Sequence, residues 1–475
     1  MLSVRFRKRD RHPEAAHARL LTADGAAADP FARALGFAGR ADEVAAGRDG
    51  TGRLVVLAGL GARADAASVR AAAGRAAGAA LSEKRLVVDA RGFAPELAAE
   101  AAVGASLRGW RFDRLKTRPD LDTDPPRLKH LEIVTPAKRD AGAVWETLSA
   151  GVAGTLFARD LVSEPANRLT PTVFAARLRG LAEEGLEVEI RDRGWLARRG
   201  FGAMLGVARG SANPPCLAVL RWKGTIDRAP IAFVGKGVTF DTGGVDLKPA
   251  DKMWEMRADM AGAAACAGAM LALARRRSPC PAVAVLGLVE NMIGAEAQRP
   301  ADVVRAVDGT TIEVIDTDAE GRLVLADCLA WTRLAYAPAA MIDLATLTGS
   351  IVVALGNHRA GMFASDAALA AHLAAAAEAV DEPVWPMPLD EAYAEALRSE
   401  IADVKNCVAE RFQPDACHAA IFLKRFAADT PWVHLDIAGV DLRPEAGDLG
   451  PAGATGFGVR LLDRLVALRF EDPDA

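Results

Sequence analysis

The chain has 475 residues, of which 51% are hydrophobic and 25% charged, and its formal net charge is −4. This length exceeds one ordinary hydrophobic core, so we expect two domains of a globular protein. The near-neutral charge argues against a nucleic-acid partner, and no apolar run approaches the ~20 residues of a membrane-spanning helix.

Cysteines and histidines limit the kinds of metal site. The six cysteines are scattered without a CxxC pair, so neither a structural zinc site nor a disulfide framework is predicted. No apolar segment with a cleavage site follows the N-terminal basic stretch, so we expect no secretory signal and a cytoplasmic location. With seven histidines and no HExxH motif, a metal centre would use mostly carboxylates.

Residues 1–140 are predicted to form a small α/β domain. Short apolar strands at 54–57 and 85–88 lie between alanine-rich helical segments, and a polar, proline-containing stretch at 117–141 is a plausible hinge or surface loop. A helix over 141–162 is expected to link this domain to the next.

Residues 163–475 are predicted to form a larger α/β domain. Apolar runs alternate with helical patterns at 257–276 and 321–335, which indicates a mixed, largely parallel sheet between helices. Sites in such sheets lie beyond the carboxyl ends of the strands, where the polar clusters of this chain occur. The predicted strands are 229–235, 282–291, 311–316, 339–345 and 432–439.

The first polar cluster is DTDAEGRLVLADCLAW, residues 316–331. On an extended chain, Asp318 and Glu320 point the same way and can aim two carboxylates at one point. On this segment alone, Asp318 could equally cap the following helix, with Glu320 favouring its positive end.

The second cluster, VGKGVTFDTGGVDLKPADKMWEMRADMAGAAA at 234–265, holds Lys236, Asp241, Lys248 and Asp259. It lacks the GxxxxGK[ST] pattern of a phosphate-binding loop. Four carboxylates from the two clusters cannot all stay ionised near one point without cations, and two divalent metals would neutralise them and activate a water molecule. A lysine can ligate metal as a neutral amine or stabilise an oxyanion as a cation.

These blocks resemble the signatures of the leucyl aminopeptidase family, the cytosolic two-metal peptidases. ENMIGAEAQRPADVV (290–304), ATLTG (345–349), IADVKN (401–406) and HLDIAG (434–439) resemble its other blocks, in the same order. The likeness covers 157–475. It implies a peptidase domain, a homohexamer with enclosed sites, and short peptides as substrates.

The resemblance also implies roles for individual residues. One metal would be held by Lys236, Asp241, Asp259 and Glu320, and a more exchangeable one by Asp241, Asp318 and Glu320. Lys248 and Arg322 would be catalytic, with Arg322 holding a bicarbonate ion as general base. The metals would be manganese or zinc, with magnesium or cobalt as further candidates. The implied substrate-binding residues are Met256, Asp316, Thr346 and Gly349.

The sequence departs from the family pattern at two places. Asp316 stands where asparagine is usual, and CVAERFQPDACHAAIFL (407–423) replaces a glycine-rich turn. We therefore expect a substrate preference of its own. A non-catalytic scaffold or regulator on the same fold is the alternative, but it would have no reason to keep the charged groups. A two-metal phosphoesterase is disfavoured because histidines are missing from the clusters.

Overall fold

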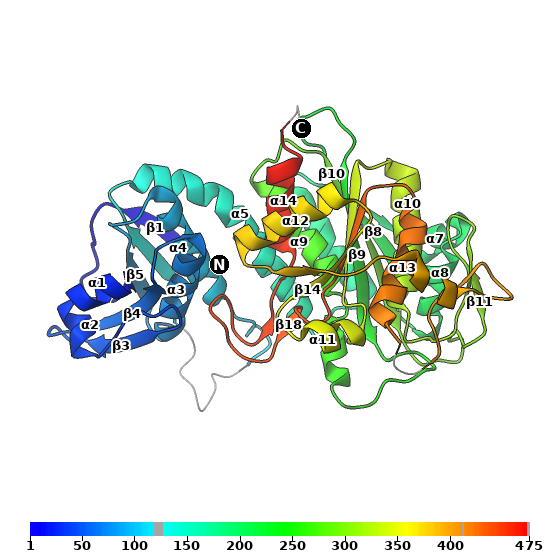
Figure 1. Ribbon diagram of the computed structural model, residues 1–475, viewed down its shortest axis with the longest axis horizontal. Coiled ribbons are helices and arrows are strands. Elements are labelled where there is room, and N and C mark those ends of the chain that lie inside the picture. Colours follow the sequence, from blue (N-terminus) through cyan, green and yellow to red (C-terminus); the bar gives the residue numbers. More distant parts are fainter. Residues whose placement is uncertain (118–126, 411–412, 473–475) are drawn as a thin grey trace. The chain divides into compact units, whose positions relative to one another are not determined.

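The computed structural model describes residues 1–117, 127–410 and 413–472, and the chain divides into two compact units (Figure 1). Unit 1 comprises Met1–Leu156 and Arg443–Gly453, and unit 2 comprises Phe157–Leu442 and Ala454–Ala475. The division falls within helix α5 (Lys138–Ser163), which includes the predicted linker. Residues 118–126 of the polar 117–141 stretch and residues 411–412 of the 407–423 segment lie outside the described residues.

Unit 1 contains, within the described residues, a six-stranded sheet in the order β1-β6-β5-β2-β4-β3. Its strands are parallel except β3, which pairs antiparallel with β4. Helices α3 (Ala66–Ala79) and α4 (Pro95–Arg108) bury mostly alanines, and these short side chains let the helices approach each other closely. The other elements are β1 (Ser3–Arg7), β2 (Ala16–Thr22), α1 (Ala23–Ala28), α2 (Pro30–Ala34), β3 (Val44–Arg48), β4 (Leu54–Gly61), β5 (Arg85–Asp89) and β6 (His130–Val134).

Unit 2 is built on an eight-stranded sheet, counted over the same described ranges, in the order β15-β14-β17-β13-β9-β10-β8-β7. The central strands β10, β9, β13 and β17 are parallel, whereas β8 pairs antiparallel with β10 and β14 with β17. The strands are β7 (Glu187–Arg191), β8 (Cys216–Trp222), β9 (Ile231–Asp241), β10 (Ala282–Asn291), β13 (Ala340–Ala345), β14 (Ala360–Ala364), β15 (Val384–Pro386) and β17 (Trp432–Asp436).

Helices cover both faces of this sheet, as predicted (Figure 1). Helices α9 (Ala261–Arg275), α12 (Ala367–Val380) and α14 (Val459–Arg469) share one hydrophobic core with one face. Helices α10 (Gly321–Tyr336) and α13 (Asp415–Ala427) share a second core with the opposite face. The remaining helices of the unit are α6 (Pro171–Arg179), α7 (Arg193–Arg199), α8 (Gly202–Val207) and α11 (Gly349–Leu355).

The predicted strand at 311–316 is not part of the main sheet. Only Thr311–Glu313 is extended, as β12, and it lies in a small separate sheet between β11 (Val303–Arg305) and β16 (Val404–Lys405). The alternation of buried Ile312 with partly exposed neighbours suits such a short, half-covered strand, whereas the central strands β9 and β10 of the main sheet are buried almost throughout.

Strand β9 continues six residues beyond its predicted end at 235 and reaches Asp241. Gly235 and Gly237 lie within the strand, where they serve close packing. A Cβ added at Gly235 would lie 2.5 Å from the Cα of Ala263, so helix α9 sits directly on the strand. Helix α9 starts four residues after the predicted helix start, because the 3₁₀ turn η3 (Met253–Ala258) precedes it.

Among the described residues, no helix has the length and apolar character needed to cross a membrane.

A substitution at Gly262 tests the tight contact between helix α9 and the sheet. A Cβ at this position would lie 2.0 Å from the carbonyl oxygen of Leu344, a backbone atom that cannot move aside. We expect Gly262→Ala to lower the free energy of unfolding by about 1–3 kcal/mol, measured by urea denaturation. Gly142→Ala is the matched control: it lies in α5 with open space around it and should be stabilising by about 0.5–1 kcal/mol. Equal effects of the two changes would contradict this packing.

Candidate active site

Side chains from three segments of unit 2 meet near the carboxyl ends of the central strands. Strand β9 carries Lys236 and Asp241, and Asp259 lies between η3 and α9. Asp318 and Glu320 come from the loop that leads into helix α10. The strand and the buried helix therefore fix the backbone on either side of the cluster.

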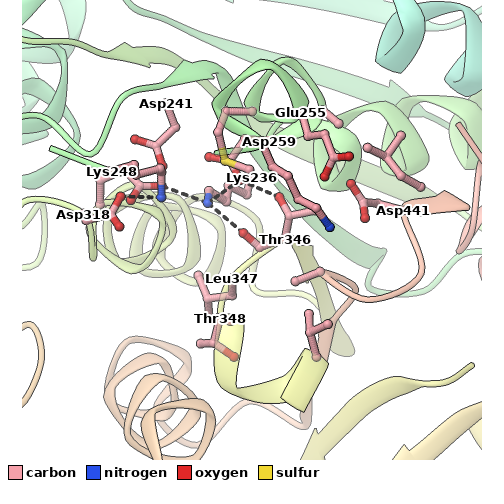
Figure 2. Close-up of a pocket in the computed structure, with 18 of the residues that line it drawn as sticks. Lys236, Asp241, Lys248, Glu255, Asp259, Asp318, Thr346, Leu347, Thr348 and Asp441 are labelled. Carbon is pink, nitrogen blue, oxygen red and sulfur yellow. Dashed lines mark hydrogen bonds and ion pairs between the residues drawn. The ribbon is translucent and has the colours of Figure 1, made fainter. Parts of the chain in front are cut away.

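Three carboxylates converge on one point. Asp241, Asp259 and Glu320 each offer an oxygen, and these oxygens all lie within 4.8 Å of one another. All three residues are buried. Lys236 Nζ lies 2.7 Å from Asp259 Oδ1 (Figure 2). It also lies 2.8 Å from Glu320 Oε1. The same amine also donates to the carbonyl oxygen of Thr346 at 2.8 Å.

A second lysine bridges the other side of the cluster. Lys248 Nζ lies 2.9 Å from Asp241 Oδ2 and also forms an ion pair with Asp318 (Figure 2). Lys248 and Asp318 are more exposed than the buried group around Lys236. The cluster thus has an enclosed half and a half that opens to the cavity.

Burial and mutual repulsion shift the titration of these groups. Burial raises the pKa of Asp318 to about 8, and the charges of Asp241 and Glu320 add to this shift. Burial likewise raises the pKa of Asp259 well above its usual value. For Lys236 and Lys248, burial opposes the charge, but the surrounding carboxylates outweigh it and raise the pKa of both amines.

The donor set fits divalent cations. Asp259 Oδ2 is buried and has no hydrogen-bond partner among the described residues, so a buried carboxylate oxygen points into the cluster unsatisfied. A buried acceptor of this kind is costly unless a donor or cation meets it. Oxygen-rich groups with one amine suit manganese, zinc or magnesium, and the two lysines supply the positive charge in this structure.

A cavity of about 360 Å³ opens beside the cluster. The predicted metal ligands and Lys248 line it at one end, and Met256, Thr346 and Gly349 also line it. Glu255 and Asp441 lie away from Lys248 in the same cavity (Figure 2), and burial raises the pKa of Asp441 to about 7.

The profile of the cytosol aminopeptidase family, catalytic domain, matches residues 156–463. This chain belongs to the cytosol aminopeptidase family. A probable cytosol aminopeptidase of Gluconobacter oxydans is 46% identical over 453 residues, covering 93% of this chain and 91% of that protein. One of Caulobacter vibrioides is 48% identical over 380 residues, covering 79% and 76%.

Two solved structures are similar to this chain over almost its whole length. The bottromycin maturation enzyme BotP in complex with Mn superimposes with a TM-score of 0.87 at 37% identity, covering 96% of this chain and 99% of that one. A tomato leucine aminopeptidase variant gives a TM-score of 0.87 at 30% identity, covering 99% and 97%. The chain is therefore an enzyme of the aminopeptidase class, a hydrolase, with the fold predicted from the sequence.

Two site residues predicted from the resemblance do not line the cavity of this cytosol aminopeptidase-family enzyme. Asp316 turns its carboxylate back onto its own loop, where Oδ1 accepts the Asp318 N–H at 2.7 Å. Arg322 is buried and donates to the carbonyl oxygen of Asn406 at 3.0 Å and to Asp415 Oδ1 at 2.8 Å. The other predicted site residues all line the cavity.

The structure adds supporting residues to which the sequence analysis gave no role. Asn291, at the end of β10, donates to Asp241 Oδ1 at 2.8 Å and to the carbonyl oxygen of Thr317 at 3.1 Å. Asp436 holds the cavity-lining segment after β13 through the Leu347 N–H and the Thr348 hydroxyl. Asn291 ends the predicted strand 282–291, and Asp436 lies within the predicted strand 432–439 and ends the observed strand β17. Their place near the carboxyl ends of parallel strands was the one available signal.

Metal binding is expected to release protons, because the bound carboxylates and the amine of Lys236 must be deprotonated. Since the metal-free pKa of Asp318 is about 8 and those of Asp259 and Lys236 are also raised, apparent metal affinity should increase from about pH 6 to about pH 9. Titration calorimetry in buffers of different ionisation enthalpy measures the released protons. Asp318→Asn should release fewer. Identical heats in all buffers would contradict the shifted pKa values.

Proposed function

We propose that this enzyme is a metal-dependent aminopeptidase that removes N-terminal residues from short peptides with the help of two divalent cations. The observation that carries the proposal is the convergence of Asp241, Asp259 and Glu320 beside two lysines at one end of a cavity. Family membership supports it, as does the close likeness in fold to BotP, an enzyme solved in complex with manganese.

The residues divide naturally between two cations. Lys236, Asp241, Asp259 and Glu320 would hold the buried one, and Asp241, Asp318 and Glu320 the one nearer the cavity. Manganese or zinc is the expected metal, with magnesium or cobalt as further candidates. When bound, the cations would activate a water molecule and polarise the scissile carbonyl.

Lys248 is placed to act on the substrate once its carboxylate partners are engaged elsewhere. In this structure its ammonium pairs with Asp241 and Asp318. If those carboxylates ligate cations, the ammonium loses its partners and can donate to the oxygen that becomes negative during hydrolysis. In this structure Asp241 and the other carboxylates outweigh burial and raise the pKa of Lys248, which favours its charged form.

The cavity accounts for action at the chain terminus. A free α-amine meets the carboxylate cluster, while the first side chain enters the space lined by Met256, Thr346 and Gly349. An acetylated terminus has no lone pair to offer there. We also propose a cytoplasmic homohexamer, on the resemblance to the family alone.

Metal depletion and replacement tests the proposal. The purified protein is stripped of metal and given manganese, zinc, magnesium or cobalt singly, and free amino acids released from aminoacyl amides and dipeptides are measured. Substrates should include N-terminal lysine and arginine because Glu255 and Asp441 line the cavity. We expect metal-restored release that requires a free α-amine.

Asp318→Ala should abolish most of this release, because it removes a predicted ligand. Glu296→Ala is the control, since Glu296 is 79% exposed. No release from any substrate by folded protein with any of the four metals would refute the proposed function.

Substitutions of the two lysines should impair the enzyme in different ways. Lys248→Met should lower kcat by about 100- to 1,000-fold, as expected for loss of an oxyanion donor, while metal content stays near that of the wild type. Lys236→Met should lower metal content itself, because it removes a ligand. Metal analysis beside steady-state kinetics separates the two; a Lys248 variant that loses metal would contradict the division of roles.

A further inference from the structure

Arg322 already has an anionic partner within the chain. Its side chain is 3% exposed, its Nη2 donates to Asp415 Oδ1 at 2.8 Å, and its Nη1 donates to the Asn406 carbonyl at 3.0 Å. The arginine is thus paired with a carboxylate from 93 residues further along the chain.

A bicarbonate ion on Arg322, which the resemblance implies, does not fit this arrangement. A planar oxyanion is held best by two neighbouring N–H groups of the guanidinium, and here one N–H of each terminal nitrogen is already donated, one of them to a carboxylate. Nε is buried without a hydrogen-bond partner among the described residues and offers one donor only. A second anion would also meet the negative charge of Asp415 at close range.

Asp415 owes its position to the segment in which this chain departs from the family. Pro414 precedes helix α13, and Asp415 is the first residue of the helix. The N–H of the next residue, Ala416, donates to Ser350 Oγ at 2.8 Å, which ties the start of the helix to α11. A glycine-rich turn in the place of this segment would carry no such carboxylate.

We propose that Asp415 is a built-in counter-anion for Arg322, so that this enzyme works without bicarbonate at that arginine. The inference rests on the proposed aminopeptidase function. Asp415 is a positioning residue: it fixes the guanidinium of Arg322 two positions after the ligand Glu320 and balances its charge. Other members of the family would then take this counter-anion from solution, whereas this chain supplies it as the carboxylate of Asp415.

The test compares hydrolysis in carbonate-depleted buffer with hydrolysis after bicarbonate is added. Wild-type kcat/KM should change by less than about twofold. Asp415→Ala, which leaves an unpaired buried guanidinium and space beside it, should lose about tenfold or more and recover most of the loss with bicarbonate. Asp415→Asn, which keeps the shape without the charge, should lose less and also respond. Glu391→Ala is the control, because it removes an exposed acid that pairs with Lys424 of helix α13, the helix that begins at Asp415.

A second measurement does not depend on turnover. Line broadening of ¹³C-labelled bicarbonate in the zinc-loaded proteins should show binding to Asp415→Ala and none to the wild type. If wild-type protein releases no amino acid with any metal, the proposed function fails, and this binding measurement still decides the present inference.

Two results would overturn it. The first is that bicarbonate stimulates the wild type, or binds to it, as strongly as it does Asp415→Ala. The second is a loss of activity in both Asp415 variants that bicarbonate leaves unchanged while their circular dichroism and melting temperature match the wild type.

Discussion

The site depends on the free-energy cost of gathering like charges in a largely buried place. Asp241, Asp259 and Glu320 present oxygens within 4.8 Å of one another in a buried environment, and Asp318 adds a fourth carboxylate at the edge. Repulsion on this scale is tolerated only if protons, ammonium groups or metal ions neutralise it. Lys236 and Lys248 form ion pairs with these carboxylates and offset part of the repulsion.

The scaffold around the cluster is stiff because the backbone of helix α9 packs directly against the backbone of the sheet. Gly235 and Gly262 let helix α9 press against β9 and β13, so the strand that carries two predicted ligands cannot shift without unpacking the helix. Amide side chains then fix the loops: Asn291 ties Asp241 to the 317 carbonyl, and Asn406 Oδ1 accepts the N–H of Ile315. Ligands held by such support keep their geometry when a cation enters.

The sequence predicted the layers of unit 2 and the members of the carboxylate cluster well. The long apolar run 282–291 and the periodic pattern of the helix that begins at Gly321 are strong local signals for a strand and a helix. The members of the carboxylate cluster were predicted from the unusual motif blocks. It did not predict that β9 runs on to Asp241, since glycine suggests a loop until the packing of a helix against it is known. Nor could it predict the Arg322–Asp415 pair, because an ion pair between residues so distant in sequence leaves no local pattern.

That ion pair also restricts how the enzyme can be altered. Replacing the segment after Asn406 by the glycine-rich turn of a relative would strand the Arg322 guanidinium in a buried place without its partner. Changing the arginine alone would leave the partly exposed Asp415 without this cation. The signature block that this chain shares with the family includes the arginine, so under our proposal such an exchange of the segment would make the enzyme depend on an anion from solution. The segment after Asn406 alone then decides where the counter-ion of Arg322 comes from.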